Sequence, residues 1–229
     1  MAPALLPMAT FRPISYRNDA SYFTAAPLGL VLHVQQGNGS PYGYFSSLVY
    51  PDRVFSHFWV SKTGTIEQYQ STDRMSWAQG NGNATYWAVE TEGYTTEPLT
   101  VPQIKGVGAL VSALGVARLV QNTPGGKGLI THGAGGQDWG NHPGCPGVLR
   151  AAQRAAILGG SPARILPTYP GLNGGSPAGV QAIQRRLGGL AVDGSYGPLT
   201  RARVIAFQRT HGLAADGLVG PLTWARMWT

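Results

Sequence analysis

The sequence has one cysteine, few charged residues and no long apolar run. A single cysteine among 229 residues cannot form an internal disulfide, so the fold must be held by its core or by a bound metal. No stretch approaches the roughly 18 apolar residues of a membrane span. The first thirteen residues also lack the basic start and the uninterrupted apolar segment of a signal peptide. We therefore expect a soluble protein without membrane insertion.

The charged residues make up 12% of the chain and carry a net charge of +7. A positive excess favours an anionic partner, such as nucleic acid, a membrane surface or a cell-wall polymer. The basic clusters interleaved with aromatic residues that nucleic-acid binders use are absent, and the arginines are scattered. A generally positive surface explains the charge equally well. The composition thus gives no support for a nucleic-acid partner.

The stretch 131–147, T-H-G-A-G-G-Q-D-W-G-N-H-P-G-C-P-G, contains His132, His142 and Cys145 among six glycines and two prolines. So few packing residues cannot fill a core, whereas glycine lets a backbone turn tightly or pass close to another group. A lone cysteine is often a small buried hydrophobe. Cys145 lies outside any apolar periodic run, which favours a functional interpretation.

Five short β-prone runs predict strands, and two of them end in a histidine. His33 and His132 follow apolar runs typical of buried strands, where a histidine is either a ligand or a hydrogen-bonded core residue. His57 shares a strand face with two aromatic residues and is either packed or part of a site. Glu90 lies within an apolar strand, where carboxylates are uncommon without a use; an edge strand with one solvated face is the alternative. The predicted strands are residues 28–34, 54–60, 65–70, 86–92 and 128–132, with a hairpin turn at 61–64.

Capping and periodicity predict the helices. Thr100 and Gln103 have the spacing of a capping box, and an apolar stripe follows at helical spacing, so we expect a helix from Thr100 to about Asn122. Pro146 is expected to begin a second helix that runs through Leu158. Strands and helices in this order predict an α/β domain over residues 1–158, with a mixed central sheet flanked by helices.

The rest of the chain changes character. Residues 159–176 are rich in Gly, Pro and Ser and are predicted to be a semi-stiff linker. After them, the motif D-G-x-x-G-P-L-T occurs at 193–200 and again at 216–223, each time leading into a predicted helix. Residues 177–229 therefore predict a small all-α domain of three helices. This region has six arginines and two aspartates but no cysteine or glutamate, and nothing in it indicates catalysis.

His33, His132 and Cys145 together suggest a zinc site. Two imidazoles and one thiolate leave a tetrahedral Zn²⁺ with an open fourth position, as in catalytic sites. A water bound there loses its proton near neutral pH, and the ion also polarises a carbonyl, which suits amide hydrolysis. A structural site would need a fourth protein ligand, for which His142 is the nearby candidate. The chain has no H-E-x-x-H motif, which excludes the thermolysin-type arrangement.

Five segments occur in a characteristic order along residues 25–158: L-V-L-H-V at His33, S-H-F-W-V-S-K-T-G-T-I-E-Q at His57, W-A-V-E-T-E-G at Glu90, I-T-H-G at His132 and C-P-G at Cys145. In this order they resemble the zinc-dependent type 2 N-acetylmuramoyl-L-alanine amidases, which include phage endolysins and peptidoglycan recognition proteins. The two D-G-x-x-G-P-x-T repeats and the F-Q pair of residues 177–229 resemble the type 1 peptidoglycan-binding module.

The resemblance implies roles for individual residues. His33, His132 and Cys145 correspond to zinc ligands, Glu90 to a general base or water-orienting carboxylate, and His57 to an active-site neighbour. Three positions depart from the family pattern: Ser56 stands where some members have tyrosine, Pro143 where many have lysine, and Ala78 where many have histidine. We expect His142 to replace the lysine as the group that stabilises the oxyanion.

The expected protein is a monomeric hydrolase that cleaves the N-acetylmuramoyl–L-alanine amide of bacterial peptidoglycan. Its C-terminal module would hold it on the wall. The lack of a signal peptide suits a phage lysin that accumulates in the host cytoplasm before it acts on the wall; a host enzyme exported by an unusual route and acting outside the cell would look the same. Two alternatives remain at this point: a non-catalytic, receptor-like peptidoglycan-binding protein, and a zinc endopeptidase that cuts the stem peptide.

Overall fold

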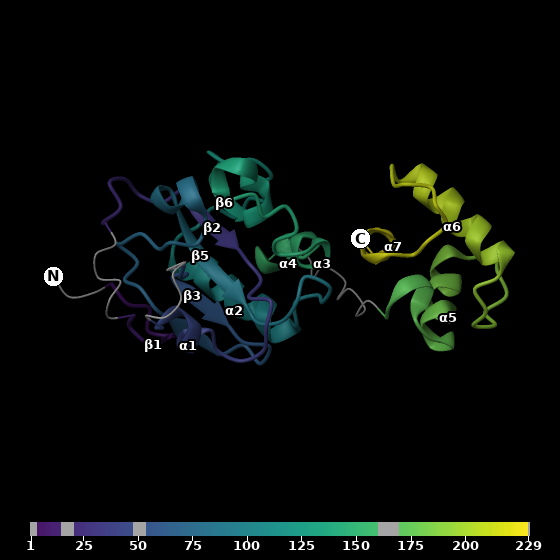
Figure 1. The fold of residues 1–229 in the computed structure, drawn as a ribbon, viewed down its shortest axis with the longest axis horizontal. Helices are drawn as coiled ribbons and strands as arrows, with labels where there is room; N and C mark the ends of the chain where they lie inside the picture. Colours follow the sequence, from purple (N-terminus) through teal and green to yellow (C-terminus); the bar gives the residue numbers. More distant parts are fainter. Residues whose placement is uncertain (1–3, 15–20, 48–53, 160–169, 229) are drawn as a thin grey trace. The chain divides into compact units, whose positions relative to one another are not determined.

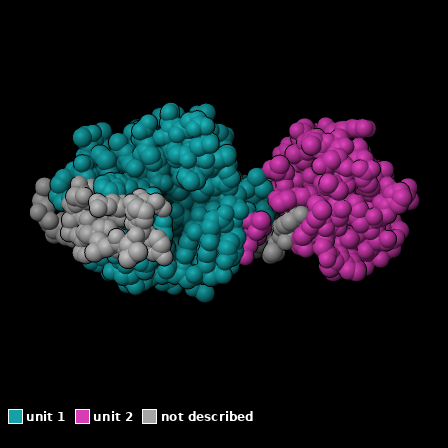
Figure 2. All heavy atoms as spheres, viewed as in Figure 1, with its two compact units in different colours: residues 1–95, 99–162 teal, residues 96–98, 163–229 magenta. Residues whose placement is uncertain are grey.

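The computed structural model describes residues 4–14, 21–47, 54–159 and 170–228, which fall into two units (Figure 2). The first unit comprises Met1–Thr95 and Leu99–Pro162, and the second comprises Thr96–Pro98 and Ala163–Thr229. Most of the predicted linker lies outside the described residues, because 160–169 are not among them.

A six-stranded mixed sheet forms the centre of the first unit (Figure 1). The strand order is β1-β4-β3-β5-β2-β6, and the β3–β4 hairpin is the antiparallel pair among otherwise parallel neighbours. Strand β2 lies between β5 and β6 and is buried along its length, as its unbroken apolar sequence predicts. The mixed sheet is confirmed, although β1 was not predicted. The strands are β1 (Thr10–Phe11), β2 (Gly29–Leu32), β3 (Phe58–Val60), β4 (Ile66–Gln68), β5 (Tyr86–Thr91) and β6 (Gly128–Thr131).

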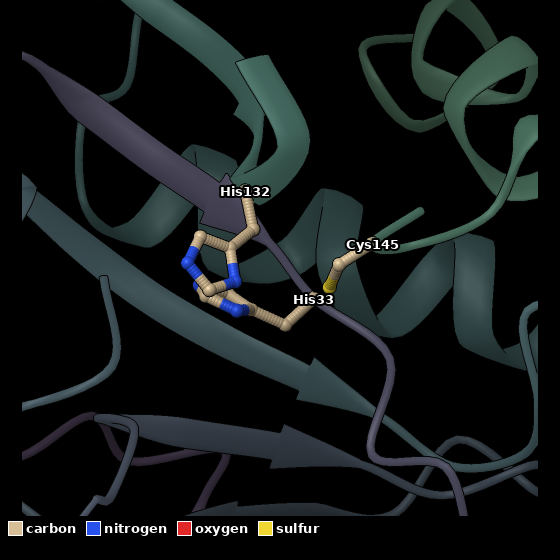
Figure 3. A group of neighbouring side chains, drawn as sticks. All are labelled: His33, His132 and Cys145. Atoms are coloured by element: carbon tan, nitrogen blue, oxygen red, sulfur yellow. The ribbon is translucent and has the colours of Figure 1, made fainter. Parts of the chain in front are cut away.

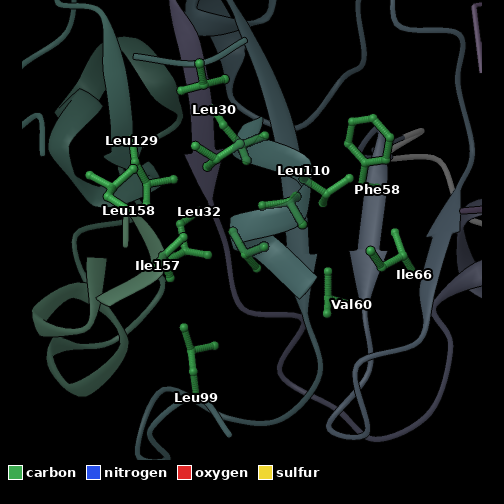
Figure 4. Close-up of a cluster of buried hydrophobic side chains, with 14 residues drawn as sticks. Leu30, Leu32, Phe58, Val60, Ile66, Leu99, Leu110, Leu129, Ile157 and Leu158 are labelled. Atoms are coloured by element: carbon green, nitrogen blue, oxygen red, sulfur yellow. The ribbon is translucent and has the colours of Figure 1, made fainter. Parts of the chain in front are cut away.

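Helix α2 (Val101–Ala113) packs on one face of the sheet and builds the main core (Figure 4). Its predicted capping box is present, with the Gln103 backbone N–H donating to Thr100 Oγ1 at 3.2 Å. Leu110 is fully buried against the strands, and each such leucine stabilises the fold by about 1.5–3 kcal/mol. The predicted end near residue 122 is wrong, because Gly115 adopts a positive φ of 64° directly after the last turn.

The chain after Cys145 forms two short helices instead of the one predicted. They are α3 (Val148–Ala152) and α4 (Arg154–Ile157). Pro146 does not begin the helix, because the glycine that follows it has a φ of 97°. Gln153 separates the two helices, and its carboxamide forms hydrogen bonds with both the N–H and the C=O of Leu99, at 2.7 and 3.1 Å.

The face of the sheet opposite α2 carries the histidines. Side chains alternate along a strand, so Leu30 and Leu32 join the core beneath α2 while Val31 packs with Ile130 on the other face. By the same alternation, His33 falls on the face of Val31. The shorter elements of the first unit are α1 (Tyr42–Phe45) and two 3-10 helices, η2 (Gly80–Ala84) and η3 (His132–Trp139).

The second unit contains the three helices that the sequence predicts (Figure 1). Each motif copy is held by hydrogen bonds from a buried glutamine of its own. Gln184 donates to the Asp193 carboxylate at 2.7 Å and to the threonine hydroxyl of the same motif at 3.3 Å. Gln208 makes the equivalent bonds to Asp216 at 2.9 Å and to its threonine at 3.1 Å. The elements are η4 (Leu172–Gly174), α5 (Pro177–Leu187), α6 (Pro198–Thr210) and α7 (Pro221–Trp228).

Candidate active site

Three candidate side chains lie in one row across the sheet. His33 follows β2, Glu90 lies in β5 and His132 follows β6, and β2 is the central strand of the three. The parallel register sets these three residues level with one another at the carboxyl ends of the strands. Adjacent strands are about 4.8 Å apart, so side chains on the same face at the same level meet. The two imidazole ring centroids are 4.4 Å apart.

Cys145 joins this row from the glycine-rich loop. The Gly133 backbone N–H donates to the Cys145 carbonyl at 2.9 Å, which holds the loop against the start of η3. A Cβ at position 133 would lie 2.8 Å from the Pro143 carbonyl oxygen, so this approach requires glycine. The side chains of His33, His132 and Cys145 converge (Figure 3), and their candidate ligand atoms lie within 4.8 Å of one another.

The hydrogen bonds of the His33 and His132 rings determine which ring nitrogen faces the cluster of His33, His132 and Cys145 (the ligand group). His33 Nε2 lies 3.1 Å from Gln79 Oε1, and His132 Nε2 lies 2.7 Å from the Trp139 carbonyl oxygen. The orientation of the Gln79 amide follows from its other bond, because its Nε2 donates to the Tyr86 carbonyl at 3.0 Å. Both Nε2 atoms therefore act as donors. Each Nδ1 keeps its lone pair for a metal, and a ligating histidine typically has its other ring nitrogen held by a hydrogen bond of this kind.

Burial keeps both imidazoles neutral. It lowers the pKa of His33 well below the usual value, with a further contribution from His132, and it also lowers the pKa of His132. The neutral imidazole is the form that binds metals. Burial, with the nearby charge of Glu90, raises the pKa of the Cys145 thiol to about 12. A bound divalent cation reverses this effect, since a coordinated thiol is deprotonated.

Glu90 is a nearly buried carboxylate beside the group. Its side chain is 15% exposed, and Oε1 lies 3.9 Å from His33 Nδ1. Its Oε2 is buried and has no hydrogen-bond partner among the described residues. Burial raises the pKa of Glu90 to about 8, against the opposing effects of the Ser56 hydroxyl and the Arg150 guanidinium. A carboxyl group with a pKa near neutrality is suited to proton transfer.

His57 is fully buried and uses both ring nitrogens within the fold. Its Nε2 lies 2.8 Å from the Arg74 carbonyl oxygen, and its Nδ1 accepts the Ala88 backbone N–H at 3.1 Å. The ring stacks on Phe23, with 5.9 Å between centroids. Burial lowers the pKa of His57 to about 4. Of the two interpretations left open by the sequence, these bonds favour the packed one, in which His57 supports the strand that carries Glu90.

His142 lies next to the group without belonging to it. Its side chain is exposed, and its ring centroid is 4.7 Å from that of His132. Among the described residues, the group of mutually close ligand atoms contains His33, His132 and Cys145 and leaves His142 out. The fourth protein ligand that a structural zinc site requires is thus not supplied by His142 in this arrangement.

Sequence reasoning missed two residues that hold the site in place. Gln79 fixes the His33 ring from the segment before η2. Arg150 is fully buried and donates to Thr91 Oγ1 at 2.7 Å, and Thr91 Oγ1 in turn donates to the His33 carbonyl at 2.6 Å. Neither residue belongs to a recognisable motif. An arginine within an otherwise apolar stretch, shortly after Cys145, is the one signal that the sequence offered.

A pocket of about 420 Å³ adjoins Glu90. Its wall combines uncharged amides, from Gln35 and Gln36, with the aromatic rings of Tyr44 and Phe45. The Gln35 amide is held in place by the Trp59 indole N–H, which donates to Gln35 Oε1 at 2.6 Å. Glu90, beside the ligand group, therefore borders a hollow large enough for part of a substrate.

The sheet, the group of two histidines and a cysteine, and the adjoining carboxylate define an α/β protein with a site of the metal-hydrolase type. Residues 24–148 match the family model described as N-acetylmuramoyl-L-alanine amidase, and residues 176–227 match the one described as putative peptidoglycan binding domain. The chain belongs to the N-acetylmuramoyl-L-alanine amidase family. It is a peptidoglycan amidase with an additional peptidoglycan-binding domain.

Several solved structures are similar to the chain. A selenomethionine derivative of AmpD has a TM-score of 0.52 at 19% identity, covering 67% of this chain and 96% of that one. The amidase LysC from Clostridium intestinale gives 0.44 at 18% identity, with coverage of 68% and 100%. The Ph2119 endolysin of a Thermus scotoductus bacteriophage gives 0.45 at 18% identity, with coverage of 66% and 99%. At 19% identity the likeness to AmpD concerns the fold alone. No curated protein matches the chain.

Proposed function

We propose that the chain is a zinc-dependent hydrolase that cleaves the amide between the lactyl group of N-acetylmuramic acid and L-alanine. The observation that carries this proposal is the convergence of His33, His132 and Cys145, whose ligand atoms lie within 4.8 Å of one another. Two neutral imidazoles and one thiolate form a donor set that Zn²⁺ prefers. Three protein ligands leave a coordination position open to water or substrate, which a catalytic site requires.

When bound, the ion would polarise the substrate carbonyl and acidify a water molecule. In this proposal Glu90 is the proton carrier. Its unpartnered Oε2 accepts the proton of the attacking water and then passes it to the leaving amine of L-alanine. In the same proposal His142, which is exposed beside His132, donates a hydrogen bond to the carbonyl oxygen as that oxygen gains negative charge. His57 holds β5 in place by accepting the Ala88 N–H.

The proposed domain boundaries follow the change in sequence character. Residues 1–158 form the amidase domain, 159–176 a linker and 177–229 the wall-binding domain. Tethering by the last domain raises the local concentration of cleavable bonds without adding a catalytic contact. We further propose that the protein is a phage lysin, made in the host cytoplasm, and that it acts as a monomer on bacterial peptidoglycan. Among the described residues, no helix has both the length and the apolarity of a membrane span.

The decisive experiment identifies the new ends produced in purified cell walls. The protein is assayed with its metal, after dialysis against a chelator, and after Zn²⁺ is restored, and its metal content is measured in each state. We expect newly exposed N-terminal L-alanine in the first and third states only. New termini at other stem-peptide residues would identify an endopeptidase. No new termini from zinc-loaded protein would identify a non-catalytic receptor, and full activity without metal would refute the zinc site.

A further inference from the structure

A second pocket, of about 420 Å³, opens in the second unit beside the first turns of α6. It is formed within this unit alone and includes none of the candidate active-site residues. Because the family match assigns peptidoglycan binding to residues 176–227 as a whole, the place of contact within them is open. The pocket is lined by Tyr196, Gly197, Pro198, Arg201, Ala202 and Ile205.

The internal repeat gives two of these residues a counterpart that is packed in the second copy. The position of Tyr196 in the first motif corresponds to Val219 in the second, and that of Arg201 corresponds to Trp224. Val219 and Trp224 are 0% and 1% exposed, so the second copy uses both positions for packing. In the first copy, Tyr196 is half-buried and Arg201 is exposed. The same two positions are therefore packed in the second motif copy, whereas in the first copy they line an open pocket.

The two polar lining residues are held in place by the second motif. Tyr196 Oη donates to the Gly217 carbonyl at 3.1 Å, and Arg201 Nη2 donates to the Asp216 carbonyl at 2.8 Å. The Asp216 carboxylate itself accepts from the Gln208 amide and from a backbone N–H. Arg201 has no carboxylate within ion-pair distance in the part of the chain that the structure describes, although its charge acts on the nearby Asp216 carboxylate. The remaining N–H groups of the Arg201 guanidinium can donate to a ligand. Because the side chain is already held by its bond to the Asp216 carbonyl, binding would cost it little further conformational entropy.

We propose that this pocket binds a free carboxylate of a peptidoglycan stem peptide through Arg201, with Tyr196 and Ile205 contacting the adjoining peptide. The proposal rests on the proposed wall-binding function of the unit. Arg201 is the charged residue of the pocket, in a region with six arginines and two aspartates. The planar guanidinium suits two-pronged binding of a carboxylate. In intact peptidoglycan the free carboxylates belong to the stem peptides, because the lactyl carboxyl group of N-acetylmuramic acid is bound in the amide to L-alanine and the other sugar groups are neutral hydroxyl and acetamido groups.

The test compares full-length protein with the variants Arg201→Gln, Arg201→Lys and Arg209→Gln. The Arg209 variant removes the same charge from the exposed surface of the same helix, outside the pocket, and serves as the matched control. Binding is measured on ice, with short contact, to walls freed of other anionic polymers and to chitin, a peptide-free glycan that carries no carboxylates. Thermal unfolding of each variant checks that the second unit remains folded.

We expect Arg201→Gln to bind intact walls roughly tenfold more weakly, because a charge-assisted hydrogen bond is lost. Arg201→Lys keeps the charge but lacks the planar fork, so it should bind more weakly than the wild type. Arg209→Gln should match the wild type, and peptide-free glycan should be bound weakly by all four proteins. Equal losses in Arg201→Gln and Arg209→Gln, wild-type binding by Arg201→Lys, or undiminished binding to peptide-free glycan would each overturn the proposal. Release of N-terminal alanine by the same samples reports separately on the proposed function.

Discussion

The role of Gln79 as the support of the first metal ligand can be tested by replacing it with leucine. Leucine has a similar volume but cannot accept the hydrogen bond from His33 Nε2, which is 3.1 Å long in the structure. The substitution also removes the bond from Gln79 Nε2 to the Tyr86 carbonyl at 3.0 Å. Gln79 is fully buried, so water cannot replace either bond without a rearrangement.

Two separate losses follow from this substitution. Removing the outer partner of a ligating histidine weakens metal binding by about 10–100-fold. This range corresponds to about 1.4–2.8 kcal/mol of binding free energy. Leaving buried polar groups without partners lowers the free energy of unfolding of the metal-free protein by about 1–3 kcal/mol. The loss of metal affinity arises because the His33 ring is no longer fixed, so it is particular to this position. The loss of unfolding free energy would follow from any substitution that leaves buried polar groups without partners.

The control is Gln153→Leu, which removes two buried hydrogen bonds to the Leu99 backbone in the same unit. Zinc affinity is measured by competition with a chromophoric chelator, and stability by urea unfolding of the metal-free proteins. Both variants should be destabilised to a similar extent, but Gln153→Leu should keep its zinc affinity within about threefold, since distant sites act independently. Equal zinc affinity of Gln79→Leu and the wild type would refute the proposed support of His33.

Three further predictions concern the metal, the domain division and the pH dependence of the second unit. Cys145→Ser should lose most of its zinc by elemental analysis and nearly all amidase activity; an active, zinc-loaded variant would show that Cys145 is not a ligand. Removing residues 177–229 should weaken wall binding in a sedimentation assay and leave zinc content unchanged, whereas loss of zinc would mean that the two parts fold as one. Hydrogen bonds from a backbone N–H and a glutamine lower the pKa values of Asp193 and Asp216 below their usual 3.8. These carboxylates thus stabilise the folded unit above that pH and lose their effect as the pH falls below it. Thermal unfolding should show this loss in the wild type and a smaller one in the Asp193→Asn, Asp216→Asn double variant.

Local signals in the sequence were enough for most of the fold. The apolar run before His33 predicts a buried central strand, and β2 is that strand. The Thr100–Gln103 spacing predicts a capping box that the structure contains. Helix ends were harder to predict, because they depend on backbone conformations that composition alone does not determine. Gly115 ends α2 early, and Gln153 divides the last helices of the first unit.

The sequence by itself determined the chemical types present: two histidines at strand ends, one cysteine in a glycine-rich loop, and a repeated motif in the last part of the chain. Only the tertiary structure decided which of these residues meet, because the parallel register brings His33 level with Glu90 and His132 across three strands. It also decided that Gln79 turns the Nδ1 of His33 toward the ligand group. Such contacts join residues far apart in the chain, and no local pattern encodes the distance between them.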